Sequence, residues 1–247
     1  MKLIINAEDF GLSESINKGI CEGLKEGFVT SASLFVNAKY TQQAVNLIKE
    51  NNFKNVGVHL NITYGTPILP SAKIKSLIEH NGNFRYMCSM PFYAKYKDVK
   101  NELEAQIQKF LSFGITPSHL DFHHYFYSSK EVYSAYLELA KKYNLPVRSM
   151  TPQTALLAKQ NGLKTPDLFI EDFHGGFNSN VQTLKEIASE IKNKDGICEL
   201  MTTVGYIDSY TTSQTNYLAR EEELLALKQA KNQNVWKDIE LTDFTKI

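Results

Sequence analysis

Carboxylates and imidazoles occur in this sequence at three places where an apolar, strand-like run gives way to polar residues. Asp9 comes shortly after one such run, and His59 and His123 lie at the ends of two others. One carboxylate and two neutral imidazoles are a common ligand set for a catalytic divalent ion, because they leave positions for water and substrate. Each residue alone could instead be a polar group hydrogen-bonded at a strand end. Their coincidence predicts a metal site, for which we expect Mg²⁺ or Zn²⁺.

Two acidic residues next to these positions could complete the chemistry. Asp121 precedes His123 by two positions, so on a strand both side chains share a face, and Asp121 could orient a ligand or simply cap the strand end. Glu8 could act as a general base, although it could also be a solvated loop acid. Adjacent strand residues point in opposite directions, so a role for Glu8 beside Asp9 requires the chain to turn there.

Four further residues are weaker candidates for binding substrate or orienting the ligands: Arg148, His119, His124 and His174. Arg148 lies at another predicted strand end and could pair with an acid of the first segment, or lie on the surface. We rank the two histidines at positions 119 and 124 below His123. His174 could be an ordinary loop residue.

Length and composition indicate one globular unit. The chain has 247 residues, 43% of them apolar, and we interpret residues 1–247 as a single domain because no internal repeat or composition shift divides them. The 27 basic residues balance the 27 acidic ones, so we expect neither a nucleic acid nor an anionic membrane as partner. The chain could form a homodimer.

Targeting signals and disulfides are not expected. The first apolar stretch is too short for a signal peptide, and no run approaches the roughly 18–20 apolar residues of a membrane span, so a cytoplasmic location is the simplest expectation. Three widely spaced cysteines argue against a disulfide framework and against a thiolate zinc site.

The residues that could do chemistry need a scaffold, and the pattern of elements predicts one. Strand-like segments alternate with helical patterns, which is typical of parallel strands joined by crossover helices. The predicted strands cover residues 2–6, 31–36, 56–61, 118–122, 147–150, 168–171 and 198–202. The predicted helices cover residues 14–26, 98–113, 130–143, 181–192 and 217–230. This predicts an α/β fold with a β/α barrel-like (TIM-barrel-like) sheet.

Two segments break this rhythm. Residues 62–97 follow the third strand as a long insertion rich in proline and aromatic residues, as expected of a lid or binding loop. Residues 151–165 are a second irregular insertion, which contains short helical segments. The charged run at residues 220–223 is most simply a solvated helix face.

At these motifs the sequence resembles the YdjC family of carbohydrate deacetylases. The family opens with Asn-Ala-Asp-Asp-Phe-Gly, which residues 6–11 match with Glu8 in place of the first Asp. Its Gly-x-His and Pro-Thr-His-Leu-Asp-Ser-His-x-His patterns match residues 57–59 and 117–125, and a late Arg-Glu-x-Glu-Leu pattern matches residues 220–224. The resemblance covers nearly the whole chain.

The resemblance implies a β/α barrel and a divalent metal on Asp9, His59 and His123. It also implies hydrolysis of an N-acetyl group from an amino sugar or short oligosaccharide, a small-molecule carbohydrate partner. In that scheme the ion activates a water and stabilises the oxyanion, and Glu8 takes the proton.

Two departures from the family pattern leave alternatives open. Glu8 is one methylene longer than the family's Asp, and Thr203 stands where the family has the histidine thought to protonate the leaving amine. Another imidazole, His174 or His124, could substitute for it. The chain could instead be a metal- and sugar-binding homologue with little or no turnover. A barrel enzyme of another reaction class, such as an aldolase or isomerase, is a third hypothesis.

Overall fold

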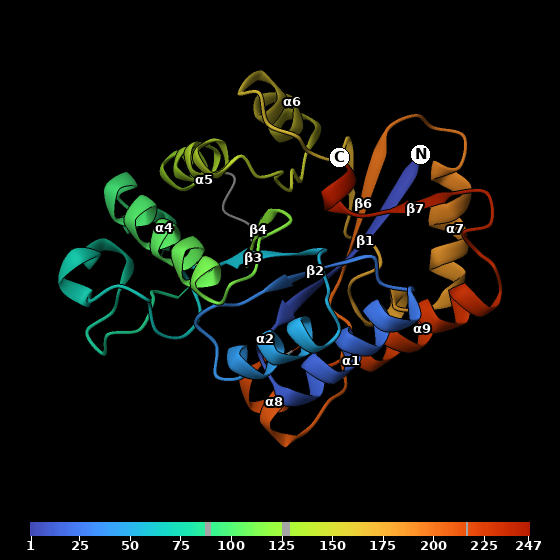
Figure 1. Cartoon of the computed structure of the whole chain (residues 1–247), viewed down its shortest axis with the longest axis horizontal. Helices are drawn as coiled ribbons and strands as arrows, with labels where there is room; N and C mark the ends of the chain where they lie inside the picture. Colours follow the sequence, from blue (N-terminus) through green and yellow to red (C-terminus); the bar gives the residue numbers. More distant parts are fainter. Residues whose placement is uncertain (87–89, 125–128, 216) are drawn as a thin grey trace.

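The computed structural model describes residues 1–86, 90–124, 129–215 and 217–247. Its centre is a parallel sheet with strand order β4-β3-β2-β1-β6-β5, to which β7 adds by pairing with β1. The sheet curls into a half-barrel, which confirms the predicted barrel-like α/β fold (Figure 1). The strands are β1 (Lys2–Phe10), β2 (Ser31–Leu34), β3 (Val56–Leu60), β4 (Leu120–Phe122), β5 (Leu168–Ile170), β6 (Ile197–Thr202) and β7 (Glu240–Thr242).

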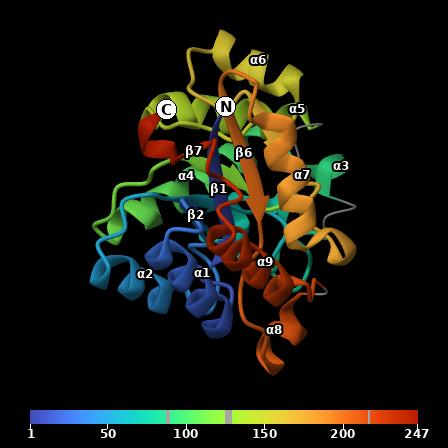
Figure 2. The same ribbon diagram turned by 90° about the vertical axis from the view of Figure 1, so that its right-hand side faces the viewer.

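Helices surround this sheet. In Figures 1 and 2, α1, α2 and α9 lie together on one side, α7 packs beside α9, and α4 lies against α5. The two chain termini lie close together in both views. The helices are α1 (Glu14–Glu26), α2 (Thr41–Glu50), α3 (Met90–Tyr93), α4 (Tyr96–Ser112), α5 (Lys130–Tyr143), α6 (Pro152–Gln160), α7 (Val181–Ile191), α8 (Ser209–Gln214) and α9 (Arg220–Asn232).

Helix α1 shows how local sequence sets these elements. Ser13 caps its start, with the hydroxyl accepting from the Ile16 backbone N–H at 3.1 Å. Gly27 ends it in the left-handed conformation, at φ 77°. Ile16 and Ile20 lie on one face at four-residue spacing and are fully buried against the sheet. The predicted helix therefore has the predicted bounds.

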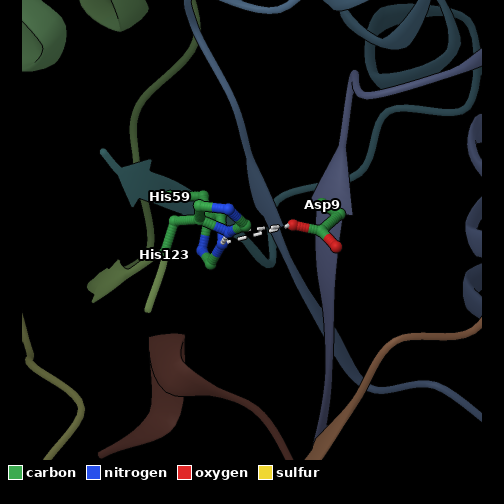
Figure 3. Close-up of side chains that lie close together, drawn as sticks. All are labelled: Asp9, His59 and His123. Atoms are coloured by element: carbon green, nitrogen blue, oxygen red, sulfur yellow. Dashed lines mark hydrogen bonds and ion pairs between the residues drawn. The ribbon is translucent and has the colours of Figure 1, made fainter. Parts of the chain in front are cut away.

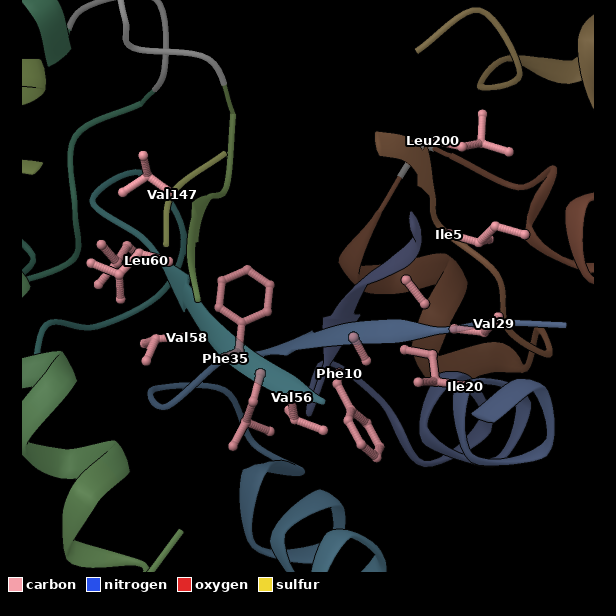
Figure 4. Packing of buried hydrophobic residues seen from close by; sticks show 14 of the residues in the cluster. Ile5, Phe10, Ile20, Val29, Phe35, Val56, Val58, Leu60, Val147 and Leu200 are labelled. Carbon is pink, nitrogen blue, oxygen red and sulfur yellow. The ribbon is translucent and has the colours of Figure 1, made fainter. Parts of the chain in front are cut away.

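The core fills the space inside the half-barrel and between the sheet and its helices. Strand β1 is buried from Leu3 to its end, because it lies at the centre of the sheet with both faces covered. Figure 4 shows Phe10, Val56 and Ile20 on the side of the central strands that faces the helices, and the Phe35 ring on the opposite side of these strands. This apolar packing fixes the strand ends from which the polar side chains project.

The insertion after β3 is present as predicted, and α4 anchors it. The carboxylate of Glu102, fully buried in α4, accepts from the backbone N–H groups of Ile68 and Leu69 at 2.8 and 3.0 Å. Asp98 accepts from the Ser76 N–H at 2.9 Å. The insertion is therefore tied to the barrel wall along one helix.

One predicted strand is wrong, and the sequence analysis missed other elements, among them α2 and β7. Residues 147–150 do not form a strand: Val147 makes a single bridge with Leu120, and the chain then leaves the sheet towards the Thr151 cap of α6. Helix α2 was not predicted, since Tyr40 precedes it without a capping side chain. Strand β7 was not predicted either, because three residues near the end of a chain carry little periodicity.

Two of the three cysteines lie in the described residues. Cys21 and Cys198 are buried free thiols, and Cys88 lies outside the described residues. No helix in the described ranges is both long and apolar enough to cross a membrane.

Candidate metal centre

Asp9, His59 and His123 meet at one edge of the sheet, as the sequence predicts. Asp9 Oδ1 lies 3.5 Å from His59 Nε2 and 3.3 Å from His123 Nδ1, and the two nitrogens are 3.3 Å apart (Figure 3). They come from the end of β1, from β3 and from the residue after β4. Asp9 and His59 are buried, whereas His123 is partly open. The cluster thus has one accessible side.

A β-bulge lets both acids of β1 face this cluster. Between Ala7 and Phe10 the register with β2 shifts, so three steps along β1 match two along β2. Asp9 adopts φ 67°, a left-handed conformation that is uncommon for a non-glycine residue. Consequently the possible ligand atoms of Asp9, His59 and His123 all lie within 4.8 Å of one another, and the same holds for those of Glu8, His59 and Asp121. The turn that a role for Glu8 requires is present.

Asp121 orients His59, in agreement with its predicted place. Its Oδ1 lies 2.8 Å from His59 Nδ1, and its Oδ2 accepts from Ser33 Oγ at 2.6 Å and from Asn6 Nδ2 at 3.2 Å. Nδ1 therefore carries the proton, and Nε2 is directed at Asp9. Burial lowers the pKa of His59, but the carboxylates of Asp121 and Asp9 outweigh it and raise that pKa to about 10.

The donor set fits a cation. Asp9 Oδ1 is buried and has no hydrogen-bond partner among the described residues, although it faces two imidazole nitrogens. Its other oxygen, Oδ2, accepts from Arg220 Nη2 at 2.6 Å. Burial raises the pKa of Asp9, but the Arg220 guanidinium and both imidazoles hold it well below its usual value. An ionised carboxylate oxygen without a donor, next to two nitrogen ligands, is what a divalent ion requires.

Arg148 links Glu8 to a second buried acid. Its Nη1 bonds to Glu8 Oε1, while Nε and Nη2 bond to Glu199 Oε1 at 2.9 and 2.6 Å. Burial raises the pKa of Glu199 to about 7, although Arg148 acts in the opposite direction. Arg148 is therefore part of the interior network and not a surface residue. It holds the Glu8 carboxylate in place.

His119 is not brought to the metal centre. It is fully buried, its ring stacks on Phe244 at a centroid distance of 3.8 Å, and it fills the space where a Cβ on Gly57 would come within 2.4 Å. Burial lowers its pKa to about 3. In this structure its contacts are those of a packed core side chain.

His124 lies beside the cluster but points to another partner. It has φ 61°, and its Nδ1 shares a hydrogen bond of 2.9 Å with Thr63 Oγ1. Its ring lies 4.0 Å from that of His123. Burial and the neighbouring imidazole lower the pKa of His124 to about 3. Tyr125, the last residue of the same motif, lies outside the described residues.

His174 and Thr203 meet on the β6 side of the centre. His174 Nδ1 lies 3.3 Å from Thr203 Oγ1 and 3.4 Å from Glu223 Oε1. Thr203 directly follows β6, whose Thr202 is in register with Ala7 of β1. The imidazole of His174 therefore lies against Thr203, the residue that stands where the family motif carries a histidine.

The interpretation of residues 220–223 as a solvated helix face is wrong for its two ends. Arg220 and Glu223 are buried, because this face of α9 packs onto the ends of β1 and β6 and binds Asp9 and Thr203. Their three-residue spacing, which puts both on one helix face, was a usable signal. The sequence analysis also missed the contributions of Glu199, Ser33 and Asn6. A signal existed for Glu199, because it is a charged residue between Cys198 and Leu200 in an apolar strand.

The parallel half-barrel, with one carboxylate and two imidazoles at its strand ends, defines the protein as a β/α barrel with a candidate metal centre. The family model of YdjC-like proteins matches residues 2–238. The chain belongs to this family, which confirms the resemblance seen in its motifs.

Named relatives cover the chain from end to end. A carbohydrate deacetylase from Clostridium beijerinckii is 39% identical over 250 residues and covers 100% of both chains. Another, from Geobacillus stearothermophilus, is 34% identical over 91% of this chain and 87% of its own. A crystal structure from Enterococcus faecalis V583, of a protein named for cellobiose-phosphate cleavage, matches with TM-score 0.92 and 28% identity over 99% of this chain and 98% of that one.

Proposed function

We propose that this protein is a metal-dependent hydrolase that removes N-acetyl groups from an amino sugar or a short oligosaccharide. The observation that carries the proposal is the β1 bulge, which presents Asp9 to two imidazoles and Glu8 to His59 and Asp121. The relatives named carbohydrate deacetylases support the substrate class.

Asp9, His59 and His123 would hold the ion, with Mg²⁺ or Zn²⁺ as the expected metals. When bound, the ion would polarise the acetyl carbonyl and lower the pKa of a water at the site. Asp121 accepts the Nδ1 proton of His59 and so directs Nε2 towards Asp9, as the atom that would bind the ion once the ion displaces its proton. Arg220 occupies Oδ2 of Asp9 and so leaves Oδ1 as the free ligand atom.

Glu8 is the proposed general base. Its carboxylate is almost fully buried and is fixed by Arg148, which Glu199 holds in turn. A base fixed by a buried ion pair would keep its distance to the attacking water, and this matters because misplacement by about 1 Å can cost on the order of a hundredfold in rate. The extra methylene of Glu8 relative to Asp is therefore compatible with the role.

One observation favours a second function, binding of metal and sugar without turnover. Thr203 occupies the position of the family's histidine, and a threonine hydroxyl cannot act as an acid near neutral pH. If no other group protonates the leaving amine, carbon–nitrogen cleavage slows by roughly 10²–10⁴.

Acetate release separates these functions. Metal-reconstituted protein is incubated with N-acetylglucosamine, with diacetylchitobiose and with the phosphate ester of diacetylchitobiose. The phosphate ester is included because the similar Enterococcus faecalis protein is named for cellobiose-phosphate cleavage. We expect acetate from at least one of them, and none from the His123→Ala variant. Sugar binding without acetate would favour the second function. Turnover of non-acetylated sugar phosphates alone would favour an aldolase or isomerase.

A further inference from the structure

Apart from the proposed metal ligands, His174 is the described histidine that combines a buried acidic partner, Glu223, with an accessible ring. We propose that His174 is the general acid that protonates the leaving amine, and that the Thr203 hydroxyl links it to the buried carboxylate of Glu223. This inference rests on the proposed deacetylase function. It assigns a role that the family motif, with Thr203 in place of histidine, leaves vacant.

The hydrogen bonds run in one direction. Thr203 Oγ1 donates to Glu223 Oε1 at 3.0 Å, so it has a lone pair to accept the Nδ1 proton of His174 at 3.3 Å. Glu223 is fully buried, and its Oε2 accepts from the Thr203 backbone N–H at 2.5 Å. A buried carboxylate at the end of this chain fixes Nδ1 as a donor, in the manner of an acid–histidine pair in other hydrolases.

The ring of His174 is held so that its second nitrogen is free. It stacks on Tyr217 at a centroid distance of 3.9 Å and an interplanar angle of 22°. Tyr217 is itself fixed, because its hydroxyl bonds to Glu223 and accepts from the Gly175 N–H at 3.0 Å. Nε2 of His174 makes no hydrogen bond with any residue that the structure describes, and 35% of the side chain is exposed. That nitrogen can therefore reach a substrate.

A single guanidinium ties this group to the metal centre. Arg220 donates to Asp9 Oδ2 through Nη2 at 2.6 Å and to the Thr203 carbonyl through Nη1 at 3.0 Å. Thr203 and Asp9 are thus bound to the same side chain at the ends of neighbouring strands. Through Thr203, His174 therefore lies on the β6 side of the centre.

His124, the other imidazole near the centre, has different surroundings. Its Nδ1 bonds to Thr63, and its ring packs on His123. No carboxylate forms an ion pair with it among the described residues, in contrast to His174 with Glu223. The geometry therefore points to His174.

The proposed hydrolysis moves one proton from water to Glu8 and one from His174 to the leaving nitrogen. Glu8 takes a proton from the attacking water as oxygen bonds to the acetyl carbon. The carbon–nitrogen bond then breaks, its electron pair stays on nitrogen, and the Nε2 proton of His174 forms the new N–H bond. Acetic acid and the free amino sugar leave, and the proton held by Glu8 returns through solvent to His174. No oxidant or further reactant is needed.

The test compares two leaving groups. In His174→Gln, acetate release from the N-acetyl sugar that wild type uses best should fall by roughly 10²–10⁴, because an alkyl amine leaves only when protonated. Hydrolysis of 4-nitrophenyl acetate should change little, since nitrophenolate leaves without a proton. His80→Gln, at an exposed position of the insertion, is the matched control and should behave as wild type.

A second pair of variants tests the bridge. Thr203→Val removes the hydroxyl at nearly constant volume and should lose about tenfold or more on the amide alone, whereas Thr203→Ser should keep most of the activity. Equal losses of His174→Gln on the amide and the aryl ester would overturn the acid role and indicate a structural one. Unchanged amide turnover in His174→Gln would also overturn it. Absence of acetate from wild type, by contrast, would overturn the proposed function itself.

Discussion

Asp121 Oδ1 lies 2.8 Å from Nδ1 of His59, and both side chains are completely buried. The contact determines which nitrogen of His59 carries the proton, and it turns the other nitrogen towards Asp9. Asp121 keeps this position because Ser33 and Asn6 donate to its second oxygen. A buried carboxylate behind a ligand imidazole is a common device for raising ligand basicity.

The Asp121→Asn variant should bind metal about 10–100-fold more weakly, because an amide cannot supply the negative charge behind His59. Isothermal titration calorimetry with Zn²⁺ on metal-stripped protein measures the change. Asp238→Asn, at an exposed position, is the matched control. Equal affinities of the Asp121→Asn variant and wild type would show that His59 does not depend on this contact.

Metal affinity should depend on pH through His59. Its pKa in the folded state is about 10, above the ordinary 6.5. The proton on His59 therefore contributes its full stabilisation to the metal-free fold below pH 6.5, and this contribution is lost as the pH rises through 10. A cation must displace that proton from Nε2. The apparent metal affinity should therefore rise with pH across this window, and binding near neutral pH should release about one proton.

Calorimetry in buffers of different ionisation enthalpy counts the released protons. His123→Ala keeps the Asp121–His59 pair and should still release the proton if it binds metal at all. Affinity that is constant between pH 6.5 and 9 would contradict the assignment of His59 as a ligand that is protonated without metal.

The convergence of Asp9, His59 and His123 could be predicted from sequence because it follows from topology. The carboxyl ends of parallel strands meet at one edge of a sheet, so Asp9, His59 and His123 converge whatever the loops between them do. The spacing of two between Asp121 and His123 likewise predicted a shared face. Periodicity also located the long helices, since their apolar stripes are local.

The rest depends on contacts between distant parts of the chain. Arg220 and Glu223 lie three residues apart on a helix that also carries the exposed Glu222, and only the packing of α9 against the ends of β1 and β6 buries them. The link from His174 to Thr203 spans two loops and has no local signal. Residues 147–150 have strand-like composition but leave the sheet after one bridge, which sequence periodicity cannot show.

Replacing Glu8 by glutamine should abolish most turnover while leaving metal affinity close to that of wild type. Loss of a general base typically removes about 10²–10⁴ in rate, and Glu8 is not part of the Asp9–His59–His123 ligand cluster. Steady-state acetate release and metal titration on the same preparation provide both measurements. Turnover within a few-fold of wild type would assign the proton to another group.

Removal of Arg220 should weaken the fold as well as the site. Arg220→Met leaves the buried Asp9 carboxylate without its cation and the Thr203 carbonyl without its donor, which should lower the free energy of unfolding by about 3–5 kcal/mol. Urea denaturation of the metal-free protein measures it, with the exposed Lys231→Met as control. A loss no larger than that of the control would contradict the structural role of Arg220.

Stoichiometric metal restoration tests the central claim most directly. Metal-stripped protein is titrated with Zn²⁺ or Mg²⁺ while acetate release from diacetylchitobiose is recorded. We predict that turnover rises from near zero and saturates at about one ion per chain, and that Asp9→Asn and His123→Ala stay inactive throughout. Acetate release by the stripped protein, or full restoration in either variant, would contradict a metal-dependent deacetylase centred on Asp9, His59 and His123.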